Sequence, residues 1–494
     1  MADFDLAIIG GGINGAGIAR DAAGRGLKVV LIEQNDLASG TSSASSKLIH
    51  GGLRYLEHGA LRLVRAALSE REVLLRMAPH LIRPLRFVLP LVAGSRSPFV
   101  LRLGLFVYDL IGRREILPGT RVLDLIIDAA GQPLKPRFHH AYEYSDCFAD
   151  DARLVVLNAV DAAERGAAIR TRTRCVRAER AAEWRLILNA RGEREVVTAR
   201  VLVNAAGAWV ETVAETVLRQ SPPRRLRLDK GSHIVVRRLY DHDRAYILQA
   251  ADGRVVFAIP FQQDFTLIGT TDRSFSGDPA GVAPTGEEID YLCGVINAFF
   301  RTTIGAADVV WAFAGVRSLY DDGARKPQDI GRDYVLMLDK SFGAAPLLTV
   351  YGGKLTTFRR LAEDVLARLS PFFPRLRPWT AKSSLPGGDF VYDGAPTLIE
   401  GTRRRWPFLT EDHARRLVGA YGTRVEQVLQ TATRLDDLGI RFGADLAAAE
   451  VRYLMTKEWA QTADDVLWRR SKLGLRFSQA ERAALERFMA ARNG

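Results

Sequence analysis

The sequence predicts a mixed α/β fold, α+β overall, with an open parallel sheet at the N-terminus, an interleaved β-rich domain and an all-helical C-terminal domain. The chain opens with a strand, a glycine turn, a helix and a second strand, as a parallel sheet does. Short β-like segments alternate with charged turns at residues 167–204 and again at 226–275. Residues 397–494 look almost wholly helical. A length of 494 residues suits two or three domains.

The opening unit is visible as changes in residue pattern. Phe4–Ile9 is a short apolar run and Gly10–Gly12 forms a turn. Ile13–Arg25 then has helical character and is closed by Gly26. Lys28–Ile32 is the second apolar run, so the whole stretch predicts one βαβ unit.

Three glycines in this unit follow the pattern G-x-G-x-x-G. Gly10 permits the sharp turn, Gly12 lets a pyrophosphate approach the backbone, and Gly15 lets the helix pack on the strand. The N-terminus of the helix adds N–H groups and a positive dipole end. Glu33 ends the second strand, where an acid can bind the ribose hydroxyls of adenosine. We therefore expect a Rossmann-type dinucleotide-binding domain; an ordinary βα turn is the alternative.

The loop that follows bears on which dinucleotide is bound. Residues 40–55 are rich in small and hydroxyl side chains and also contain Lys47, His50, Arg54 and Tyr55. Such a loop offers many close donors to an extended cofactor. A flexible surface linker is the alternative, but it would not need these larger side chains.

Two further strand-to-turn segments fit FAD. Residues 201–209 run from a buried-type strand into small residues, and Gly352–Lys354 follows the strand Leu347–Tyr351. We expect a helix over Leu355–Leu369, whose N-terminus would stabilise negative charge on the N1–C2=O edge of a reduced flavin. Each turn alone is as easily an ordinary βα turn, but three in one chain favour FAD.

The remaining segments indicate the domain limits. Leu61–Met77 reads as an amphipathic helix, residues 86–145 hold short apolar runs with prolines, and the character of the chain changes near Gly387. We predict a discontinuous FAD-binding domain, a substrate domain and a helical C-terminal domain. The FAD-binding domain comprises residues 1–85, 145–225 and 316–386. The substrate domain comprises 86–144 and 226–315, and the helical domain comprises 387–494.

Composition narrows the cellular setting. No basic leader precedes an apolar run, so we expect no secretory signal or transit peptide, and the apolar stretch Phe99–Ile111 is too short to span a bilayer. The isolated Cys147, Cys175 and Cys293 fit a reduced cytosolic protein, and no Cys/His spacing predicts a metal site. A net charge of +12 favours anionic substrates, anionic lipid or nucleic acid as partners.

Four sequence motifs point to one family. IGGGINGAGIARDAAGRG stands at Ile9–Gly26 and GGKLTTFR at Gly352–Arg359, and the segments SSKLIHGGLRYLE and YSDCFADDARLV lie between them. In these motifs, and along nearly its whole length, the chain resembles the FAD-dependent, quinone-linked (aerobic) glycerol-3-phosphate dehydrogenases. The second signature usually has tyrosine where this chain has Phe358, which removes one ring hydroxyl.

The resemblance implies oxidation of sn-glycerol 3-phosphate to dihydroxyacetone phosphate, with hydride transfer from carbon 2 to FAD and onward electron transfer to ubiquinone or menaquinone. A doubly charged phosphate needs converging arginine and lysine side chains. The residues that the resemblance assigns to substrate binding are Arg54, Tyr55, Thr270, Arg317, Arg332 and Lys354. Those expected to bind FAD are Gly10, Gly12, Ile13, Asn14, Gly15, Glu33, Gln34, Thr41, Ser42, Ser46, Lys47, His50, Gly51, Gly52, Leu53, Val176, Ala206, Gly207, Trp209, Gly352, Gly353, Lys354, Leu355 and Thr356.

Three residues are candidates for the catalytic set. His233 is the candidate base for the hydroxyl proton, because histidine both takes up and releases protons near neutral pH. Arg317 would stabilise the developing alkoxide, and Lys354 adds a second cation. The alternative for His233 is a satisfied histidine on a strand.

A quinone dissolves in the bilayer, so the resemblance implies contact with an anionic membrane surface. Ser97–Arg114 combines apolar, aromatic and basic residues and is the predicted membrane-facing segment; a core helix of the substrate domain is the alternative. We expect a peripheral or monotopic protein on the cytoplasmic side of the inner or plasma membrane. A homodimer is implied by the resemblance, and no nucleic-acid partner is expected.

Three other functions stay open from the sequence. A related FAD-dependent oxidase, acting on glycerol 3-phosphate, an amino acid or a 2-hydroxy acid, would deliver electrons to oxygen. The net charge also permits an RNA-modifying flavoprotein, although no RNA-binding module is apparent. A non-catalytic flavin binder is disfavoured by the presence of His233, Arg317 and Lys354.

Overall fold

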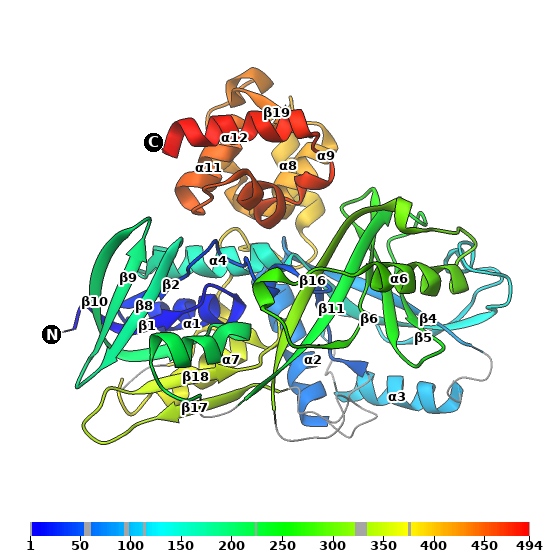
Figure 1. The fold of residues 1–494 in the computed structure, drawn as a ribbon. Helices are drawn as coiled ribbons and strands as arrows, with labels where there is room; N and C mark the ends of the chain where they lie inside the picture. Colours follow the sequence, from blue (N-terminus) through cyan, green and yellow to red (C-terminus); the bar gives the residue numbers. More distant parts are fainter. Residues whose placement is uncertain are drawn as a thin grey trace.

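Two β-sheet halves lie side by side, and a helical part sits above them (Figure 1). The structure is a computed structural model that describes residues 2–53, 61–92, 98–111, 115–222, 225–321, 333–373 and 377–493. It confirms the predicted fold class, an α/β first half joined to a β-rich second half and a mainly helical C-terminal domain.

The first half is an eight-stranded sheet with parallel strands at its centre. Strand β1 (Phe4–Ile9) pairs in parallel with β2 (Val29–Ile32) and with β10 (Glu193–Asn204), and β10 pairs in parallel with β18 (Leu347–Tyr351). The remaining strands are β7 (Ala168–Arg170), β8 (Thr173–Arg180), β9 (Trp184–Ala190) and β17 (Val335–Asp339). As the alternating pattern predicted, β8 and β9 form a meander that returns to the sheet through β10.

Both faces of this sheet are buried. On one face, Leu6 and Ile8 of β1 pack with helices α1 (Ile13–Gly24), α4 (Asp151–Glu164) and α7 (Phe358–Arg368). On the other face, Ala7 and Ile9 pack against the β8–β9 meander. A parallel strand covered on both sides needs apolar residues at successive positions, which explains the continuous apolar run in β1.

The second half is a ten-stranded sheet built around β11 (Leu226–Arg237), which pairs antiparallel with β14 (Phe265–Gly269) and β16 (Val309–Tyr320). Helix α6 (Gly286–Phe299) packs on one face, and α2 (Leu61–Met77) and α3 (Pro98–Ile111) pack on the other. The remaining strands are β3 (Leu48–Ile49), β4 (Ile82–Pro90), β5 (Arg121–Asp124), β6 (His140–Ala149), β12 (Ala245–Gln249), β13 (Val255–Phe261) and β15 (Arg273–Phe275).

Three of the predicted domain limits fall inside strands of the second sheet. Helix α2 has the bounds expected for it, Leu61–Met77. The limits drawn at residues 85, 145 and 316, however, fall inside β4, β6 and β16 of the second sheet. These three strands belong wholly to the second sheet, so the predicted limits cut through strands instead of falling at the crossings between the halves. The division into domains stays a prediction with these limits shifted.

The C-terminal part has a hydrophobic core of its own. Its helices are α8 (Ala395–Arg405), α9 (Glu411–Tyr421), α10 (Val425–Leu429), α11 (Ala448–Lys457) and α12 (Gln479–Asn493). The expectation of an almost wholly helical region misses a short hairpin, β19 (Arg441–Gly443) and β20 (Leu446–Ala447). Its turn residues, Ala444 and Asp445, both have positive φ. Glycine is the usual sequence signal for this conformation, so the turn could not be predicted from these residues.

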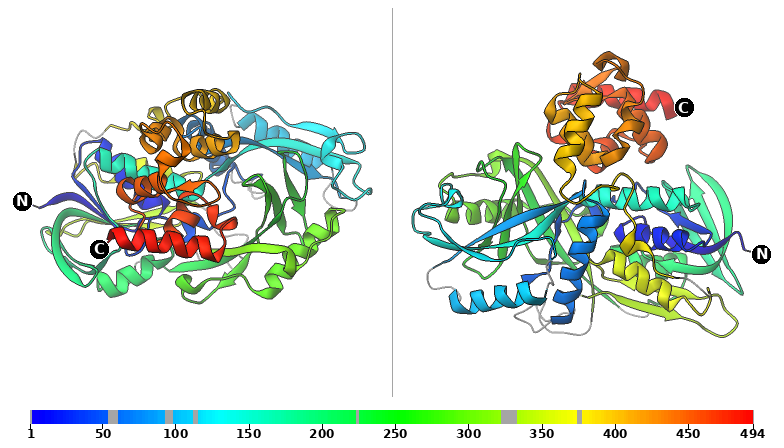
Figure 2. Two further views of the ribbon diagram at one scale, coloured as in Figure 1. Left: turned by 90° about the horizontal axis from the view of Figure 1, so that it is seen from above. Right: turned by 180° about the vertical axis from the view of Figure 1, so that it is seen from behind.

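Buried ion pairs dock the helical domain above α4 and the junction of the two halves (Figures 1 and 2). Arg153 of α4 pairs with Glu458, and the guanidinium of Arg470 pairs with Asp36, which follows β2. Arg172, from the first half, pairs with Asp465 of the helical domain. Apart from Arg172, which is partly exposed, these groups are buried, so removing one partner would leave an uncompensated charge in the interface.

Three further properties hold for the described residues. No helix there has both the length and the apolar character needed to cross a membrane. No cluster of three or more potential metal ligands occurs in that part of the chain. Cys147, Cys175 and Cys293 are buried with free thiols.

His80 makes the stability of the folded chain depend on pH. Both of its ring nitrogens are buried, and neither has a hydrogen-bond partner among the described residues. Burial lowers the pKa of His80 to about 3, and Arg153 and Arg424 act in the same direction. In the unfolded chain the pKa returns to about 6.5. Because the unfolded state alone takes up a proton in this range, the free energy of unfolding falls as the pH drops from about 6.5 towards 3.

We expect His80→Leu to remove this contribution. At pH 7 the free energy of unfolding should be unchanged or higher, because a buried unpaired polar group is lost. Between pH 7 and pH 5 the variant should lose about 2 kcal/mol less than the parent chain. Denaturant titrations at the two pH values measure this, with the exposed His139→Leu as the control. An equal pH dependence in the parent and in His80→Leu would contradict the prediction.

Candidate active site

A cavity of about 1550 Å³ lies between the two sheets. Gly10, Glu33, Ala205 and Gly352 line it, and each directly follows the carboxyl end of a parallel strand. The opposite wall comes from β11 and β16, and the loop at residues 39–53 closes the space between them. Open parallel sheets bind ligands at this edge, so the cavity is the candidate site.

The glycine turn predicted to receive a pyrophosphate forms one end of the cavity. Gly10 has φ +116°, and a Cβ added there would lie 2.5 Å from the carbonyl oxygen of Ala205. A Cβ on Gly15 would lie 1.9 Å from the carbonyl oxygen of Gly10. Gly15 therefore lets α1 pack against the turn without itself lining the cavity. Gly12, Ile13 and Asn14 do line it, so the N-terminus of α1 faces the space where a phosphate would lie.

Glu33 lines the cavity at the end of β2 and is already part of the turn. Its carboxylate accepts hydrogen bonds from the N–H groups of Gly11 (2.7 Å) and Asn35 (2.8 Å). Burial raises the pKa of Glu33, and these two backbone donors oppose the rise. The neighbouring Gln34 also lines the cavity, so both residues lie where the adenosine end of a dinucleotide was predicted.

Two other turns reach the same cavity. Ala206, Gly207 and Trp209 follow β10, and Gly352–Thr356 follows β18; all of them line the space. The amide nitrogen of the Asn14 side chain donates to the carbonyl oxygen of Gly352 (3.0 Å), which joins the second turn to α1.

One expectation about this turn is wrong. Helix α7 begins at Phe358 rather than at Leu355, and the N–H of Thr357 donates to the carbonyl oxygen of Lys354 in an intervening turn (3.1 Å). Gly352 and Gly353 both have positive φ, so the chain needs further residues before it can enter the helical conformation. The Phe358 ring is buried, and a Cβ on Gly17 of α1 would lie 2.7 Å from it, so the ring packs against that helix.

These features fit FAD. Asn14 Oδ1 is buried at the cavity wall and has no hydrogen-bond partner among the described residues, so an acceptor is available to a ligand. The N-terminus of α1 can bind a pyrophosphate. The turns that follow β10 and β18 can contact the rest of an extended cofactor.

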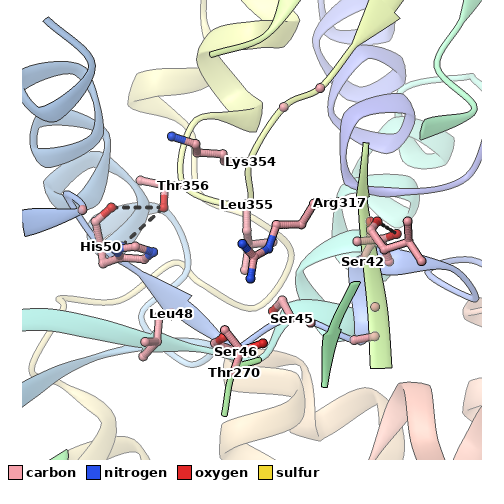
Figure 3. Close-up of a pocket in the computed structure, with 18 of the residues that line it drawn as sticks. Ser42, Ser45, Ser46, Leu48, His50, Thr270, Arg317, Lys354, Leu355 and Thr356 are labelled. Atoms are coloured by element: carbon pink, nitrogen blue, oxygen red, sulfur yellow. Dashed lines mark hydrogen bonds between the residues drawn. The ribbon is translucent and has the colours of Figure 1, made fainter. Parts of the chain in front are cut away.

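The loop at residues 39–53 is held in place from several sides. The hydroxyl of Thr41 donates to the carbonyl oxygen of Val316 on β16 (2.7 Å), and Ser42 Oγ accepts from the N–H of Ile13 (3.0 Å). The hydroxyl of Thr356 lies 3.3 Å from the N–H of His50, a bond visible in Figure 3. Of the loop residues predicted to bind FAD, the cavity is lined by Thr41, Ser42, Ser46, His50, Gly52 and Leu53.

Lys47, Gly51 and Val176 were also predicted to bind FAD, but none of them lines the cavity. Lys47 is buried, and its ammonium group pairs with Asp151 at the start of α4 (2.7 Å). Burial would raise the pKa of Asp151, but Lys47 and Lys472 outweigh it and hold the pKa below its usual value. The charge of Lys47 thus supports the loop from behind, which its position in the sequence could not reveal.

Of the predicted substrate-binding residues that the structure describes, Thr270 and Arg317 line the wall formed by the second sheet, and Lys354 lines the turn after β18. Arg317 reaches toward the middle of the cavity, with Thr270 near it and Lys354 and His50 on the far side (Figure 3). A Cβ on Gly231 would lie 2.5 Å from Thr270 Oγ1 and 3.1 Å from a terminal nitrogen of Arg317, so the two side chains converge over this glycine. Arg54, Tyr55 and Arg332 lie outside the described residues.

His233 lines the same wall of the cavity as Arg317, on β11. Its Nε2 lies 2.8 Å from Ser46 Oγ, and its Nδ1 is buried without a hydrogen-bond partner among the described residues. Burial lowers the pKa of His233 to about 3; Lys47 and Arg317 push it the same way and Asp151 opposes them. The imidazole is therefore neutral at pH 7, which is the form that can accept a proton.

Two residues of the site were missed from the sequence. Asp272 lies 3.3 Å from the guanidinium of Arg317, and the Phe313 ring stacks on the His233 ring with centroids 4.9 Å apart. Phe313 lies four residues before Arg317 on one strand, so both point to the same face; this spacing was a usable signal. Asp272 offered none, because one acid among many marks no site.

The fold and the cavity define a FAD-dependent oxidoreductase. The family described as "FAD dependent oxidoreductase" matches residues 5–359, and the "C-terminal domain of alpha-glycerophosphate oxidase" matches residues 378–492. Together with its relatives, these matches show that the chain belongs to the FAD-dependent glycerol-3-phosphate dehydrogenase family.

The relatives cover nearly the whole chain. A glycerol-3-phosphate dehydrogenase of Pseudomonas aeruginosa is 52% identical over 98% of this chain and 95% of its own length. The aerobic glycerol-3-phosphate dehydrogenase of Escherichia coli is 48% identical over 96% and 95%, and a D-erythritol 1-phosphate dehydrogenase of Brucella abortus is 50% identical over 97% and 96%. Among solved structures, the glycerol-3-phosphate dehydrogenase of Bacillus halodurans complexed with FAD has a TM-score of 0.78 at 27% identity, covering 99% of this chain and 90% of that one.

Proposed function

We propose that this protein oxidises sn-glycerol 3-phosphate to dihydroxyacetone phosphate and passes the electrons to a membrane quinone. The observation that carries the proposal is the convergence of Arg317, Thr270 and His233 in the cavity that also contains the glycine turns. Relatives named glycerol-3-phosphate dehydrogenase, at 52% and 48% identity, support the same substrate.

The chemistry divides between cofactor and protein. Bound FAD supplies the acceptor for the two electrons of the C2–H bond. Arg317 and Lys354 offer positive charge to a phosphate dianion, and Thr270 offers a hydroxyl. Arg54, Tyr55 and Arg332 are predicted to complete this set. His233 accepts the proton of the C2 hydroxyl while the hydride leaves C2, so that the C2–O bond becomes a carbonyl.

The electrostatics of His233 suit this step. Burial and the cations beside it lower the pKa of His233. A phosphate dianion in the same cavity would oppose those cations and raise the affinity of the imidazole for a proton. Substrate binding would thus strengthen the base when it is needed.

A longer polyol phosphate is the second candidate substrate. The D-erythritol 1-phosphate dehydrogenase of Brucella abortus is as similar to this chain, at 50% identity, as the glycerol-3-phosphate dehydrogenases are. Both substrates present a phosphate and a secondary alcohol, so the same cations and base would serve either.

The test is an anaerobic titration of the holoenzyme. Glycerol 3-phosphate should bleach the oxidised-flavin band at about 450 nm, and D-erythritol 1-phosphate should do so less efficiently, by comparison of kcat/KM. Glycerol, D-alanine and 2-hydroxyglutarate serve as controls. A flavin that glycerol 3-phosphate leaves oxidised would refute the proposal, and a preference for the four-carbon substrate would select the second candidate.

The quinone acceptor is supported by the apolar part of the cavity. Its wall there is built from α2 and α3, with contributions from β4, β12 and β13. The apolar lining residues are Leu61, Leu63, Phe87, Leu89, Val100, Leu101, Leu103, Val107, Ile247, Val255 and Phe257. A short-chain ubiquinone analogue should reoxidise the reduced flavin faster than oxygen does. If oxygen reoxidises the flavin as fast as the quinone does, with one peroxide formed per substrate oxidised, the oxidase alternative is indicated.

Helix α3 lies within the predicted membrane-facing segment, 97–114, at the end of the molecule opposite the helical domain (Figures 1 and 2). Leu105 and Tyr108 are buried against the second sheet, whereas Leu103, Phe106 and Leu110 are exposed. The exposed residues follow a spacing of three and four, so they share one face of the helix. We propose that this face rests on an anionic membrane surface, with the protein peripheral or monotopic on the cytoplasmic side. A homodimer stays a prediction.

Replacing Phe106 and Leu110 with serine should weaken binding to anionic lipid vesicles by roughly tenfold or more, because two apolar side chains no longer enter the interface. Their exposed fractions are 62% and 68%. Val391 and Ile440, exposed to 67% and 62%, provide a matched double serine control. Vesicle sedimentation measures the binding. Equal loss in both variants, or in neither, would show that α3 is not the contact.

A further inference from the structure

One face of strand β16 runs from the helical domain to the cavity. Alternate residues of a strand point to the same side, so Trp311, Phe313, Gly315 and Arg317 share this face. A Cβ on Gly315 would lie 2.7 Å from the carbonyl oxygen of Ala44, so the loop at residues 39–53 crosses β16 there. A displacement of Trp311 can therefore be transmitted along a single strand to Arg317.

An unbroken stack of rings lies along this face. The His233 and Phe313 rings are nearly parallel, at 9° and 4.9 Å between centroids. Phe313 and Trp311 follow at 4.5 Å, and Trp311 and Trp468 at 4.6 Å. Trp468 belongs to a helical turn, Asp465–Arg470, in the C-terminal domain. The stack thus joins the candidate base to a residue 235 positions away in a separate domain.

The stack is one of the contacts that can orient the His233 ring, which also lies against Gly269. One hydrogen-bonding contact, with Ser46, positions its ring, and Nδ1 has no partner among the described residues. The face of Phe313 limits rotation of the imidazole about its Cβ–Cγ bond. Phe313 and Trp311 are only half-buried, so the outer end of the stack needs Trp468 to cover it.

Trp468 is itself firmly held. The buried ammonium of Lys472 donates to the carbonyl oxygen of Trp468, and Gly474 lies flat against the ring, since a Cβ there would come within 2.5 Å. Arg470, on the same turn, pairs with Asp36 of the first half. Arg476, a few residues later, pairs with Asp264 of the second half. This short segment therefore bridges both halves of the molecule.

We propose that Trp468 is a positioning residue for His233, through which docking of the helical domain sets the geometry of the proton acceptor. The inference rests on the proposed function for its kinetic consequence, while the orientation of the His233 ring can be observed independently of turnover.

The test compares holoenzyme variants in anaerobic flavin reduction by glycerol 3-phosphate. Trp468→Ala should lower the limiting rate of reduction about 10- to 100-fold, because the reacting groups lose their alignment. The substrate concentration at half-saturation should change less than about threefold, since the phosphate contacts are untouched. Trp468→Phe, which keeps a ring in the stack, should restore the rate to within about threefold. If Trp468→Ala does not fold, Trp468→Leu replaces it.

A control and a second background separate positioning from general damage. Phe488→Ala disturbs the helical-domain core, where Phe488 faces Phe442, and should leave the limiting rate unchanged although it lowers the melting temperature. In a His233→Gln background, Trp468→Ala should have no further effect, because its partner is already gone. An equal rate loss in that background would overturn the proposal.

A spectroscopic measurement makes the inference independent of activity. In protein labelled at histidine, the His233 resonance, assigned by its absence from His233→Gln, should move in Trp468→Ala and stay in place in Trp468→Phe. An unmoved resonance in Trp468→Ala would overturn the inference even in an active enzyme. A parent enzyme that glycerol 3-phosphate fails to reduce, but whose His233 resonance moves as expected, would refute the proposed function alone.

Discussion

Replacing His233 with glutamine should slow reduction of the bound flavin by glycerol 3-phosphate about 10²- to 10⁴-fold, which is the usual contribution of a positioned base. Glutamine keeps a polar side chain of similar size and can still hydrogen-bond to Ser46, but it cannot accept the hydroxyl proton. Because His233 lines the wall formed by β11 and belongs to none of the glycine turns, the variant should retain FAD. Stopped-flow absorbance of the flavin band measures the rate, with exposed His139→Gln as the control.

The pH dependence provides a second measure of the same group. Burial and the neighbouring cations lower the pKa of His233 in the free enzyme to about 3, so its neutral form predominates throughout pH 6–8. Protonation of His233 should therefore not reduce kcat/KM in that range, and the acid limb attributable to it should appear only as the pH falls towards 3. If His233→Gln reduces the flavin at a rate within about threefold of the parent, another group takes the proton.

Glu458→Ala should have the largest effect on stability, about 3–5 kcal/mol. Glu458, a fully buried residue of the helical domain, pairs with Arg153 of α4 and lies 3.8 Å from the guanidinium of Arg470. Its removal leaves the buried guanidinium of Arg153 without its nearest anion, whereas Arg470 keeps its pair with Asp36. The loss is expected first as undocking of the helical domain and then as slower flavin reduction, since that domain carries Trp468.

Denaturant titration and limited proteolysis in the segment between α7 and α8 would report this loss. Glu426→Ala is the matched control, because it removes an exposed ion pair, with Arg405, and should cost less than about 1 kcal/mol. Replacing both Arg153 and Glu458 with methionine should recover much of the stability, since no unpaired charge then remains. Equal stability of Glu458→Ala and Glu426→Ala would contradict the buried-charge account.

Much of the cofactor site could be predicted because its physics is local. Gly10, Gly12 and Gly15 act within a single strand–turn–helix unit, and Glu33 follows on the next strand. Alternation in residues 167–204 likewise predicted a meander, because strand periodicity is a property of neighbouring residues. The start of α7 could not be predicted as well, since consecutive positive φ values at Gly352 and Gly353 are a tertiary outcome.

Other features had no local signal. The position of Lys47 in its loop predicted a cofactor ligand, but its ammonium group forms an ion pair with Asp151, about a hundred residues away. The exposed face of α3 and its buried face became distinguishable only once the second sheet covered Leu105 and Tyr108.

The fold class, the glycine turns and the family could be predicted from the sequence, because each depends on residues whose spacing along the chain carries the physical requirement. The tertiary structure alone decided which charges are buried in pairs, where His233 gets its low pKa, and how the helical domain reaches the cavity through Trp468. Those properties depend on burial and on contacts between segments hundreds of residues apart, and neither leaves a trace in the local pattern of residues.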